Sequence, residues 1–338
     1  MKQRYRMLAG MALMIAATMA WAAVGELKVN IKEWDVPTPR SRPHDPAVAP
    51  DGSLWWAGQV ANKLGRLDPA TGEMREYDLK TPKSGPHGIV ADREGNIWYT
   101  ANFVGMIGKL NPKTGEITEY KMPDPKARDP HSLAVDQKGV VWFTLQGANM
   151  VGRLDPKSGK IDLKDLPSPK VNPYGIVVNS KGVPFFCELK GGKLASINPQ
   201  TMEITEYALP EGSGPRRIAV AADDTLYYTD FVRGYLGKFD PKSGKHEEWA
   251  SPGGEKSEPY GITITPDGSV YYSESGIMPN TMVRFDPKSK EFSSTTIPSG
   301  GKVIRNMVST KKGDVYVACS GVNKVGIVEL SKMQMSKK

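Results

Sequence analysis

Seven residues with reactive or charged side chains recur at regular intervals along the chain. Each follows a repeated proline, or in the last copy an isoleucine, and the interval between copies is 42 to 45 residues. The seven residues are His44, His87, His131, Tyr174, Arg216, Tyr260 and Arg305. A purely structural position would keep one residue type, whereas this one keeps only a large polar or aromatic character. Imidazole, phenol and guanidinium groups can move protons, bind ligands and stabilise negative charge.

A second variable position lies 14 residues further along each copy, and it is acidic in three successive copies: Glu188, Asp230 and Glu274. Carboxylates are the preferred ligands of Mg²⁺ and Ca²⁺, but they also pair with arginine. The three histidines come from three separate copies, whereas zinc ligands usually cluster at short spacing, so a zinc site is the weaker interpretation. The sequence predicts a site with imidazoles on one side and carboxylates with Arg and Tyr on the other.

The elements that position these residues are short β-strands. In the copy that begins at Pro86, β-branched and aromatic runs at 89–91, 97–100, 107–110 and 117–120 are separated by Gly, Pro, Asn or Asp. A turn of the type Asn/Asp-Pro-x-Thr/Ser-Gly recurs between the third and fourth runs, where Pro fixes φ and Gly takes the left-handed conformation. Four antiparallel strands in a period of this length are typical of a propeller blade.

The two ends of the chain are predicted to share one blade. The last period ends after its third strand, at 325–329, and the sequence at 31–37 matches the fourth strands at 117–123 and 204–210. We therefore predict an all-β fold: a seven-bladed β-propeller of four-stranded antiparallel blades in one domain, residues 23–338. Residues 31–37 complete the blade formed by 303–330. The variable residues should converge at the mouth of the central channel, where a small-molecule ligand is expected.

The first 22 residues have the pattern of a signal peptide. Basic residues at positions 2, 4 and 6 precede an apolar run at 7–19, and Ala20-Trp21-Ala22 is a small-x-small cleavage site. The apolar run is short for a membrane span, so the expected location is the periplasm or the medium, without membrane attachment after cleavage.

The charge distribution and the cysteine positions indicate which partners and disulfides to expect. The net charge is +8, but Lys and Arg are scattered, so no nucleic-acid interface is predicted. The two cysteines, Cys187 and Cys319, fall on distant copies of the repeat, so we expect two free, buried thiols. A monomer is expected.

The repeat resembles that of the virginiamycin B lyase (streptogramin lyase) family over essentially the whole chain after residue 22. The motifs are Pro-His/Tyr-Gly-Ile, Ile-Trp-Tyr-Thr, Ile-Gly-Lys-Leu-Asn-Pro and Ile-Thr-Glu-Tyr-x-Leu/Met-Pro. The resemblance implies a seven-bladed propeller. It also implies a carbon–oxygen lyase that linearises a cyclic depsipeptide by elimination, with a Mg²⁺ ion held by a His and two Glu and a His as general base.

The family pattern is carried over to this sequence residue by residue. The two metal-binding glutamates correspond to Glu258 and Glu274, whereas the general base corresponds to Tyr260 and the metal-binding histidine to Arg216. The resemblance therefore implies Mg²⁺ on Glu258 and Glu274, with Tyr260, Glu274 and Arg216 in catalytic positions. The other variable residues are expected to bind the ligand: His44, His87, His131, Tyr174, Arg305, Glu188 and Asp230.

Three functions stay open from the sequence. The first is an exported lyase acting on a cyclic ester or depsipeptide at the channel mouth. The second is a non-catalytic periplasmic protein that binds a small anionic ligand or a partner on the same face. The third, by architectural analogy alone, is a metal-dependent lactonase.

Overall fold

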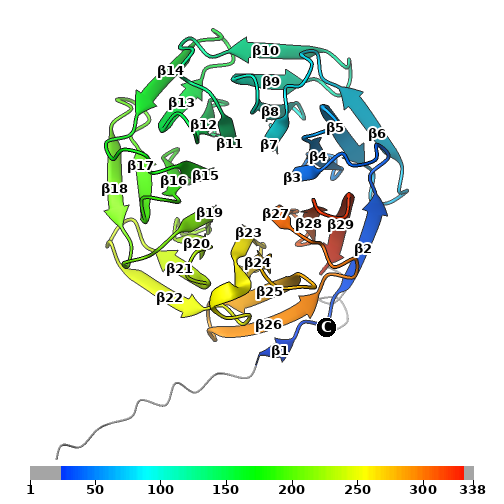
Figure 1. The fold of residues 1–338 in the computed structure, drawn as a ribbon, viewed down its shortest axis with the longest axis vertical. Helices are drawn as coiled ribbons and strands as arrows, with labels where there is room; N and C mark the ends of the chain where they lie inside the picture. Colours follow the sequence, from blue (N-terminus) through cyan, green and yellow to red (C-terminus); the bar gives the residue numbers. More distant parts are fainter. Residues whose placement is uncertain (1–23, 331–338) are drawn as a thin grey trace, which may run out of the picture.

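The chain forms a closed ring of seven β-sheets around a central channel (Figure 1). The computed structural model describes residues 24–330. The predicted signal peptide at residues 1–22 lies outside the described residues. Among those described, no helix is long and apolar enough to cross a membrane.

The blades follow one another around the ring in sequence order, each with its first strand innermost. The first strands are β3 (Pro43–Val48), β7 (Pro86–Ala91), β11 (Pro130–Val135), β15 (Pro173–Val178), β19 (Pro215–Val220), β23 (Pro259–Ile264) and β27 (Ile304–Ser309). The second strands are β4 (Leu54–Gly58), β8 (Ile97–Ala101), β12 (Val141–Leu145), β16 (Pro184–Glu188), β20 (Leu226–Asp230), β24 (Val270–Glu274) and β28 (Val315–Cys319).

The outer half of each blade is equally regular. The third strands are β5 (Lys63–Leu67), β9 (Met106–Leu110), β13 (Met150–Leu154), β17 (Lys193–Ile197), β21 (Tyr235–Phe239), β25 (Thr281–Asp286) and β29 (Lys324–Glu329). The fourth strands are β6 (Met74–Asp78), β10 (Ile117–Lys121), β14 (Ile161–Asp165), β18 (Ile204–Ala208), β22 (His246–Ala250), β26 (Glu291–Thr296) and β2 (Asn30–Asp35). A short 3-10 helix, η1 (Glu255–Ser257), precedes β23.

The predicted closure of the ring is confirmed. Strand β2 pairs antiparallel with β29 from Asn30↔Glu329 to Asp35↔Lys324, so the start of the chain completes the last blade. Ring closure removes the open sheet edges that a linear stack would expose. The two-residue strand β1 (Gly25–Glu26) adds a parallel fifth strand to β26, which the repeat did not predict because it occurs once.

The core lies between adjacent blades. Aromatic and aliphatic side chains of the second strands are fully covered, among them Trp55, Trp56, Trp98 and Trp142. Both cysteines are free and buried, as predicted.

Six of the seven first strands begin at the repeated proline and β27 begins at Ile304, in each case before the apolar run seen in the sequence. Each of the seven contains a register irregularity in its first four residues. In β7, for example, Pro86 pairs with Ala101 and the next pair is Ile89↔Tyr99. A bulge of this kind re-aims the side chains beside it. The side chains of the residues that follow the proline therefore point in a different direction from those in the regular part of the strand.

Candidate binding site at the channel mouth

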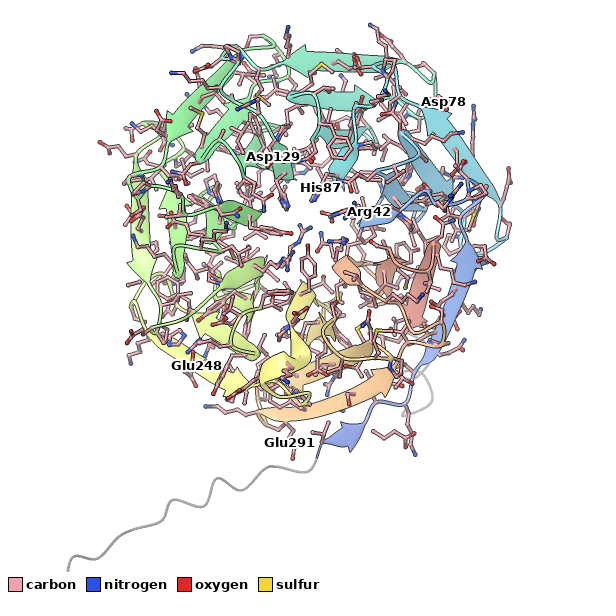
Figure 2. All side chains as sticks on the ribbon, in the orientation of Figure 1. Arg42, Asp78, His87, Asp129, Glu248 and Glu291 are labelled. Atoms are coloured by element: carbon pink, nitrogen blue, oxygen red, sulfur yellow. The ribbon has the colours of Figure 1, made fainter. Side chains whose placement is uncertain are left out.

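The seven variable residues that follow the first residue of each inner strand form one ring, here called the mouth ring: His44, His87, His131, Tyr174, Arg216, Tyr260 and Arg305. Figure 2 shows His87 and Arg42 at the centre of the propeller, whereas Asp78, Glu248 and Glu291 lie at its outer edge. Contacts between neighbouring members from His44 to Tyr260 confirm the predicted convergence of these side chains.

Half of the mouth ring is a stack of aromatic rings. The ring centroids of His44 and His87 are 3.6 Å apart, those of His87 and His131 4.0 Å, and those of His131 and Tyr174 4.0 Å. Each of these four side chains is at most 5% exposed. The stack is therefore a packed layer at the mouth of the channel.

The other half joins two phenols to a guanidinium group. The hydroxyl oxygens of Tyr174 and Tyr260 are 2.5 Å apart, and Arg216 donates to the Tyr174 hydroxyl at 3.1 Å. The Arg216 guanidinium carbon lies 3.9 Å from the ring centroid of Tyr260 and 4.0 Å from that of Phe231. Cation–π contacts with two aromatic rings fix the position of this charge.

A second polar layer supports the ring from beneath. Asp45 accepts a hydrogen bond from Arg217 at 2.7 Å and lies 2.9 Å from Nδ1 of His44. Arg217 also donates to Ser132 at 3.1 Å, and Asn306 donates to Asp45 at 3.2 Å. These contacts link blades on different sides of the channel, so they lock the ring together as well as orienting His44.

The supporting layer was missed by the sequence reasoning, although the repeat contains a signal for it. The residue two places after the repeated proline is glycine in three copies, at Gly88, Gly175 and Gly261. In the other four it is polar: Asp45, Ser132, Arg217 and Asn306. Divergence at this position, and not only at the preceding one, marks the residues that meet across the channel.

The charge at the mouth is positive and is not neutralised by acids. Among the described residues, no ion pair involves Arg42, Arg216 or Arg305, whereas Arg217 pairs with Asp45. Burial, and then the nearby charge of Arg305, lower the pKa of Arg42. The Nε atoms of Arg216 and Arg305 are buried without a hydrogen-bond partner.

The three histidines are neutral near pH 7. Burial is the largest cause that lowers the pKa of each one well below the usual value. The next causes are Arg305 and Arg217 for His44, and a neighbouring histidine for His87 and for His131. His87 Nδ1 lies 3.1 Å from the backbone oxygen of His131, which fixes Nδ1 as the protonated nitrogen.

The acids at the ends of the second strands face the blades and not the channel axis. Glu274 accepts hydrogen bonds from Ser251 and the backbone N–H of Gly253, both at 2.6 Å, and from Thr281 at 2.5 Å. Asp230 accepts from Arg233 at 2.7 Å and from the N–H of Gly214 at 2.9 Å. Because a blade is radial, alternate side chains of its strands point toward the neighbouring blades.

Glu188 is the exception among these acids, because it has no hydrogen-bond donor among the described residues. Both of its carboxylate oxygens are buried without a partner. Burial and the nearby Glu206 carboxylate raise the pKa of Glu188 to about 7, although Lys193 opposes the shift. Lys193 itself bonds to Glu206 at 2.5 Å.

The glutamates at the two metal positions of the family differ in their surroundings. Glu258 is exposed and has a left-handed backbone, with φ of 46°, directly before β23, whereas Glu274 is 1% exposed. Among the described residues, no third His, Cys, Asp or Glu joins this pair in a potential metal group. Magnesium binding by Glu258 and Glu274 therefore stays a prediction, and the donor set offers it two carboxylates at most.

One cluster does have the donor types and spacing of a metal site: His44, Asp45 and His87, whose ligand atoms lie within 4.8 Å of one another. Its electrostatic setting opposes a cation. Asp45 already binds Arg217, and burial, followed by the charges of surrounding arginines, lowers the pKa of His44. The cluster is consistent with a structural layer beneath the mouth.

Below the mouth ring, the channel contains a partly open pocket of about 460 Å³. Its walls are mostly aliphatic side chains of the first strands, and Asp45, Ser132, Arg217 and Asn306 are among its lining residues. The supporting layer therefore separates the mouth from the rest of the channel.

Comparison with known families agrees with this architecture. The sequence model of the virginiamycin B lyase family matches residues 13–195 and 170–336. The chain belongs to the virginiamycin B lyase family. The resemblance given by the repeat motifs is thereby confirmed. No curated protein matches the chain.

Solved structures of this family share the fold. A streptogramin B lyase structure is 25% identical, with a TM-score of 0.82, over 89% of this chain and 98% of that one. A virginiamycin B lyase from Staphylococcus aureus is 24% identical, with a TM-score of 0.82, over 90% of this chain and 100% of that one. A catalytically inactive virginiamycin B lyase from Staphylococcus aureus with quinupristin is 23% identical, with a TM-score of 0.81 over the same shares.

Proposed function

We propose that this member of the virginiamycin B lyase family binds a small anionic ligand at the channel mouth. One observation carries the proposal: the guanidinium groups of Arg42, Arg216 and Arg305 gather around the channel without an acidic partner. Like charges that crowd one another cost free energy, which an anion bound between them would recover. The planar guanidinium groups suit a carboxylate or phosphate.

The cation–π stack of Arg216 supports this proposal. Tyr260 and Phe231 hold the guanidinium group in place before a ligand arrives, so little conformational entropy is lost on binding. The Tyr174 and Tyr260 hydroxyls add further hydrogen-bonding groups beside this charge.

The test is the thermal stabilisation of the protein by inorganic phosphate and by citrate at constant ionic strength, with glucose as the neutral reference. We expect the melting temperature to rise with the concentration of either anion, because a ligand that binds only the folded state stabilises it. Arg305→Gln should abolish most of this shift. Arg40→Gln removes one exposed charge from the same face and should keep it. Equal shifts in the two variants would exclude the arginine cluster as the site.

Carbon–oxygen lyase activity is the second candidate. It is favoured by the retention of Glu258 and Glu274 at the two carboxylate positions of the family. Elimination also needs a group that removes a proton, and Tyr260 stands where the family has its histidine. Its hydroxyl lies 2.5 Å from that of Tyr174, and the Arg216 guanidinium group lies over its ring. The lactonase alternative gains no comparable support.

The lyase candidate is tested by incubating the protein with a streptogramin B antibiotic and following ring opening by mass spectrometry. Turnover that is lost in Tyr260→Phe, while Arg40→Gln keeps it, would support the second candidate. An unchanged antibiotic after prolonged incubation with the wild type, with and without added Mg²⁺, would exclude this substrate.

Export to the periplasm or the medium is also part of the proposal. It rests on the basic, apolar and small-x-small segments at residues 1–22. Mass spectrometry of the protein purified from cells should give a mature chain that begins near Ala23. A chain that retains Met1 and remains in the cytoplasm would contradict it.

A further inference from the structure

The exposed large hydrophobic residues of this protein gather on one face. The strand pairing Pro43↔Gly58 places the start of each first strand beside the end of the second, so the loops after the second strands surround the channel mouth. With the exception of Val24, every large hydrophobic side chain that is exposed among the described residues lies in these rim loops. They are Val60, Phe103, Val104, Val232 and Met278, and their exposed fractions are 60%, 60%, 37%, 59% and 60%.

Glycines let two of these side chains lie directly over the rim. A Cβ atom on Gly85 would lie 2.4 Å from the ring of Phe103, and one on Gly214 would lie 2.2 Å from Val232. Phe103 and Val232 are therefore packed against the backbone that leads into β7 and β19, yet most of each side chain remains exposed. This packing fixes the position of both side chains, which therefore do not lie at free loop tips.

The apolar side chains lie on opposite sides of the ring. Val60 and Phe103 belong to the first two blades, whereas Val232 and Met278 belong to the fifth and sixth, across the channel in Figure 1. A flat apolar surface laid on this face would touch all of them.

The same face is basic. In the loops that surround the mouth, exposed basic residues outnumber exposed acidic ones. The basic residues are Arg40, Arg42, Lys80, Lys83, Lys126, Arg128, Lys170, Lys190, Lys256 and Lys302, and the acidic ones are Glu211, Glu255 and Glu258.

Several of these basic residues occupy a conformation that suits glycine better. Arg40, Lys83 and Lys170 have φ values of 54°, 55° and 56°, at a position where the fifth blade has Gly212 with φ of 77°. A side chain in the left-handed region strains the backbone. Basic side chains are thus present at turns where a stability argument alone would favour glycine.

We propose that the mouth face docks on the surface of a bilayer that contains anionic phospholipids. The basic loops match the negative charge of the headgroups, and the apolar residues insert between them. The sequence predicted no membrane attachment after cleavage because the apolar run at 7–19 is short for a membrane span. Peripheral docking needs no span, and it does not depend on the anionic ligand proposed for the mouth.

The test is sedimentation of the chain from Ala23 to Lys338 with vesicles. This chain contains all seven blades and lacks the apolar leader. We expect it to sediment with vesicles of phosphatidylcholine and phosphatidylglycerol, and not with phosphatidylcholine alone. High salt should weaken the binding, because part of the attraction is electrostatic.

Two matched pairs of substitutions locate the contact. Lys83→Glu with Lys126→Glu reverses two charges on the mouth face and should weaken binding by about tenfold or more. Lys113→Glu with Lys157→Glu makes the same change in the turns between third and fourth strands, on the opposite face, and should leave binding within about twofold of the wild type. Phe103→Ser should weaken binding at high salt, where the apolar contribution dominates.

Equal binding by the two charge-reversed variants would overturn the proposal, and so would a wild type that does not sediment with anionic vesicles. In the second case an acidic soluble protein would be the better occupant of this face. The stabilisation by phosphate and citrate is measured without lipid, and neither Lys83 nor Phe103 belongs to the arginine cluster. Failure of the membrane proposal and failure of the ligand proposal can therefore be told apart.

Discussion

At the scale of single residues, the mouth is defined by groups whose charge state is set by burial. His44, His87 and His131 are packed against one another with arginines nearby, so protonation of any of them would place a positive charge beside others. The supporting layer beneath them contains the Asp45–Arg217 pair. A neutral imidazole stack is therefore the arrangement that the surrounding charges favour.

This arrangement predicts a loss of stability in mild acid. The pKa of each histidine is lowered in the folded state, so below about pH 6.5 the unfolded chain binds protons that the folded chain does not. The contribution of the histidines to stability is therefore complete above that pH and falls below it, by at most about 1.4 kcal/mol per histidine for each pH unit. Urea unfolding at several pH values should show the decline.

NMR spectra of the histidine rings test whether the lowered pKa values of the stack cause this decline. The chain has four histidines, and we expect the ring signals of the three in the stack to stay unchanged between pH 8 and about pH 5.5. Signals from these three rings that titrate near pH 6.5 would contradict the neutral stack.

The raised pKa of Glu188 predicts the opposite pH dependence of stability. Its pKa is raised from 4.5 to about 7, so the folded state holds a proton that the unfolded state releases. Its contribution to stability is therefore present below pH 4.5 and is lost as the pH rises to about 7. Glu188→Gln removes the ionisation, and we expect it to stabilise the protein by about 1 to 2 kcal/mol at pH 8 and by little at pH 5.

Denaturant unfolding of this variant at both pH values is the measurement. Glu211→Gln removes an exposed carboxylate one blade further on and serves as the control, with a small effect at either pH. A Glu188→Gln protein that is less stable than the wild type at pH 8 would show that the ionised carboxylate is stabilised by groups not considered above.

The sequence predicted the members of the mouth ring but not the direction of the acids. Position in the repeat identifies the inner residues, because all first strands meet at the axis. Whether Asp230 or Glu274 points to the axis or to the next blade depends on the pleat and on nearby donors such as Arg233 and Ser251. Those donors lie in loops that differ from blade to blade.

At the scale of elements, the strands were predictable because their residue types recur with the repeat. The glycine of the third strand has a packing cause that the sequence does not show. A Cβ atom on Gly108 would lie 2.0 Å from the ring of Tyr99, the residue paired with it across the blade. The fourth blade has Ala195 opposite Phe186 and the sixth has Val283 opposite Tyr272, so the strand tolerates a side chain at this position, and glycine is needed where the partner ring lies over it, as Tyr99 does over Gly108.

Gly108→Ala should therefore destabilise the protein by about 1 to 3 kcal/mol, because Tyr99 is fully buried and has no room to move. The reciprocal change, Ala195→Gly, removes a methyl group without creating a clash and should cost about 1 kcal/mol or less. Thermal unfolding of both variants compares the two effects. If Gly108→Ala were the milder of the two, the contact with Tyr99 would not be what selects glycine there.

At the scale of the whole molecule, the ring is held closed by the start of the chain. Strand β2 pairs with β29 along its whole length, and Glu33 accepts hydrogen bonds from the backbone N–H and the hydroxyl of Ser299 at 2.8 and 2.5 Å. The repeat predicted this closure, since 31–37 has the sequence of a fourth strand. It did not predict β1, whose two residues pair outside the seven-fold pattern.

Two truncations separate the contributions of these strands. A chain that begins at Val29 lacks β1 and should fold to a closed ring with a modestly lower melting temperature, because Leu27 also leaves a buried position.

A chain that begins at Pro37 lacks β2 as well, so the outer edge of β29 is open and the apolar surface of the last blade is uncovered. We expect this chain to associate through the open edge and to lose a single cooperative transition. Size-exclusion chromatography and thermal unfolding of the two chains give the answer. If the shorter chain stayed monomeric and melted like the longer one, closure by β2 would not be what makes the ring stable.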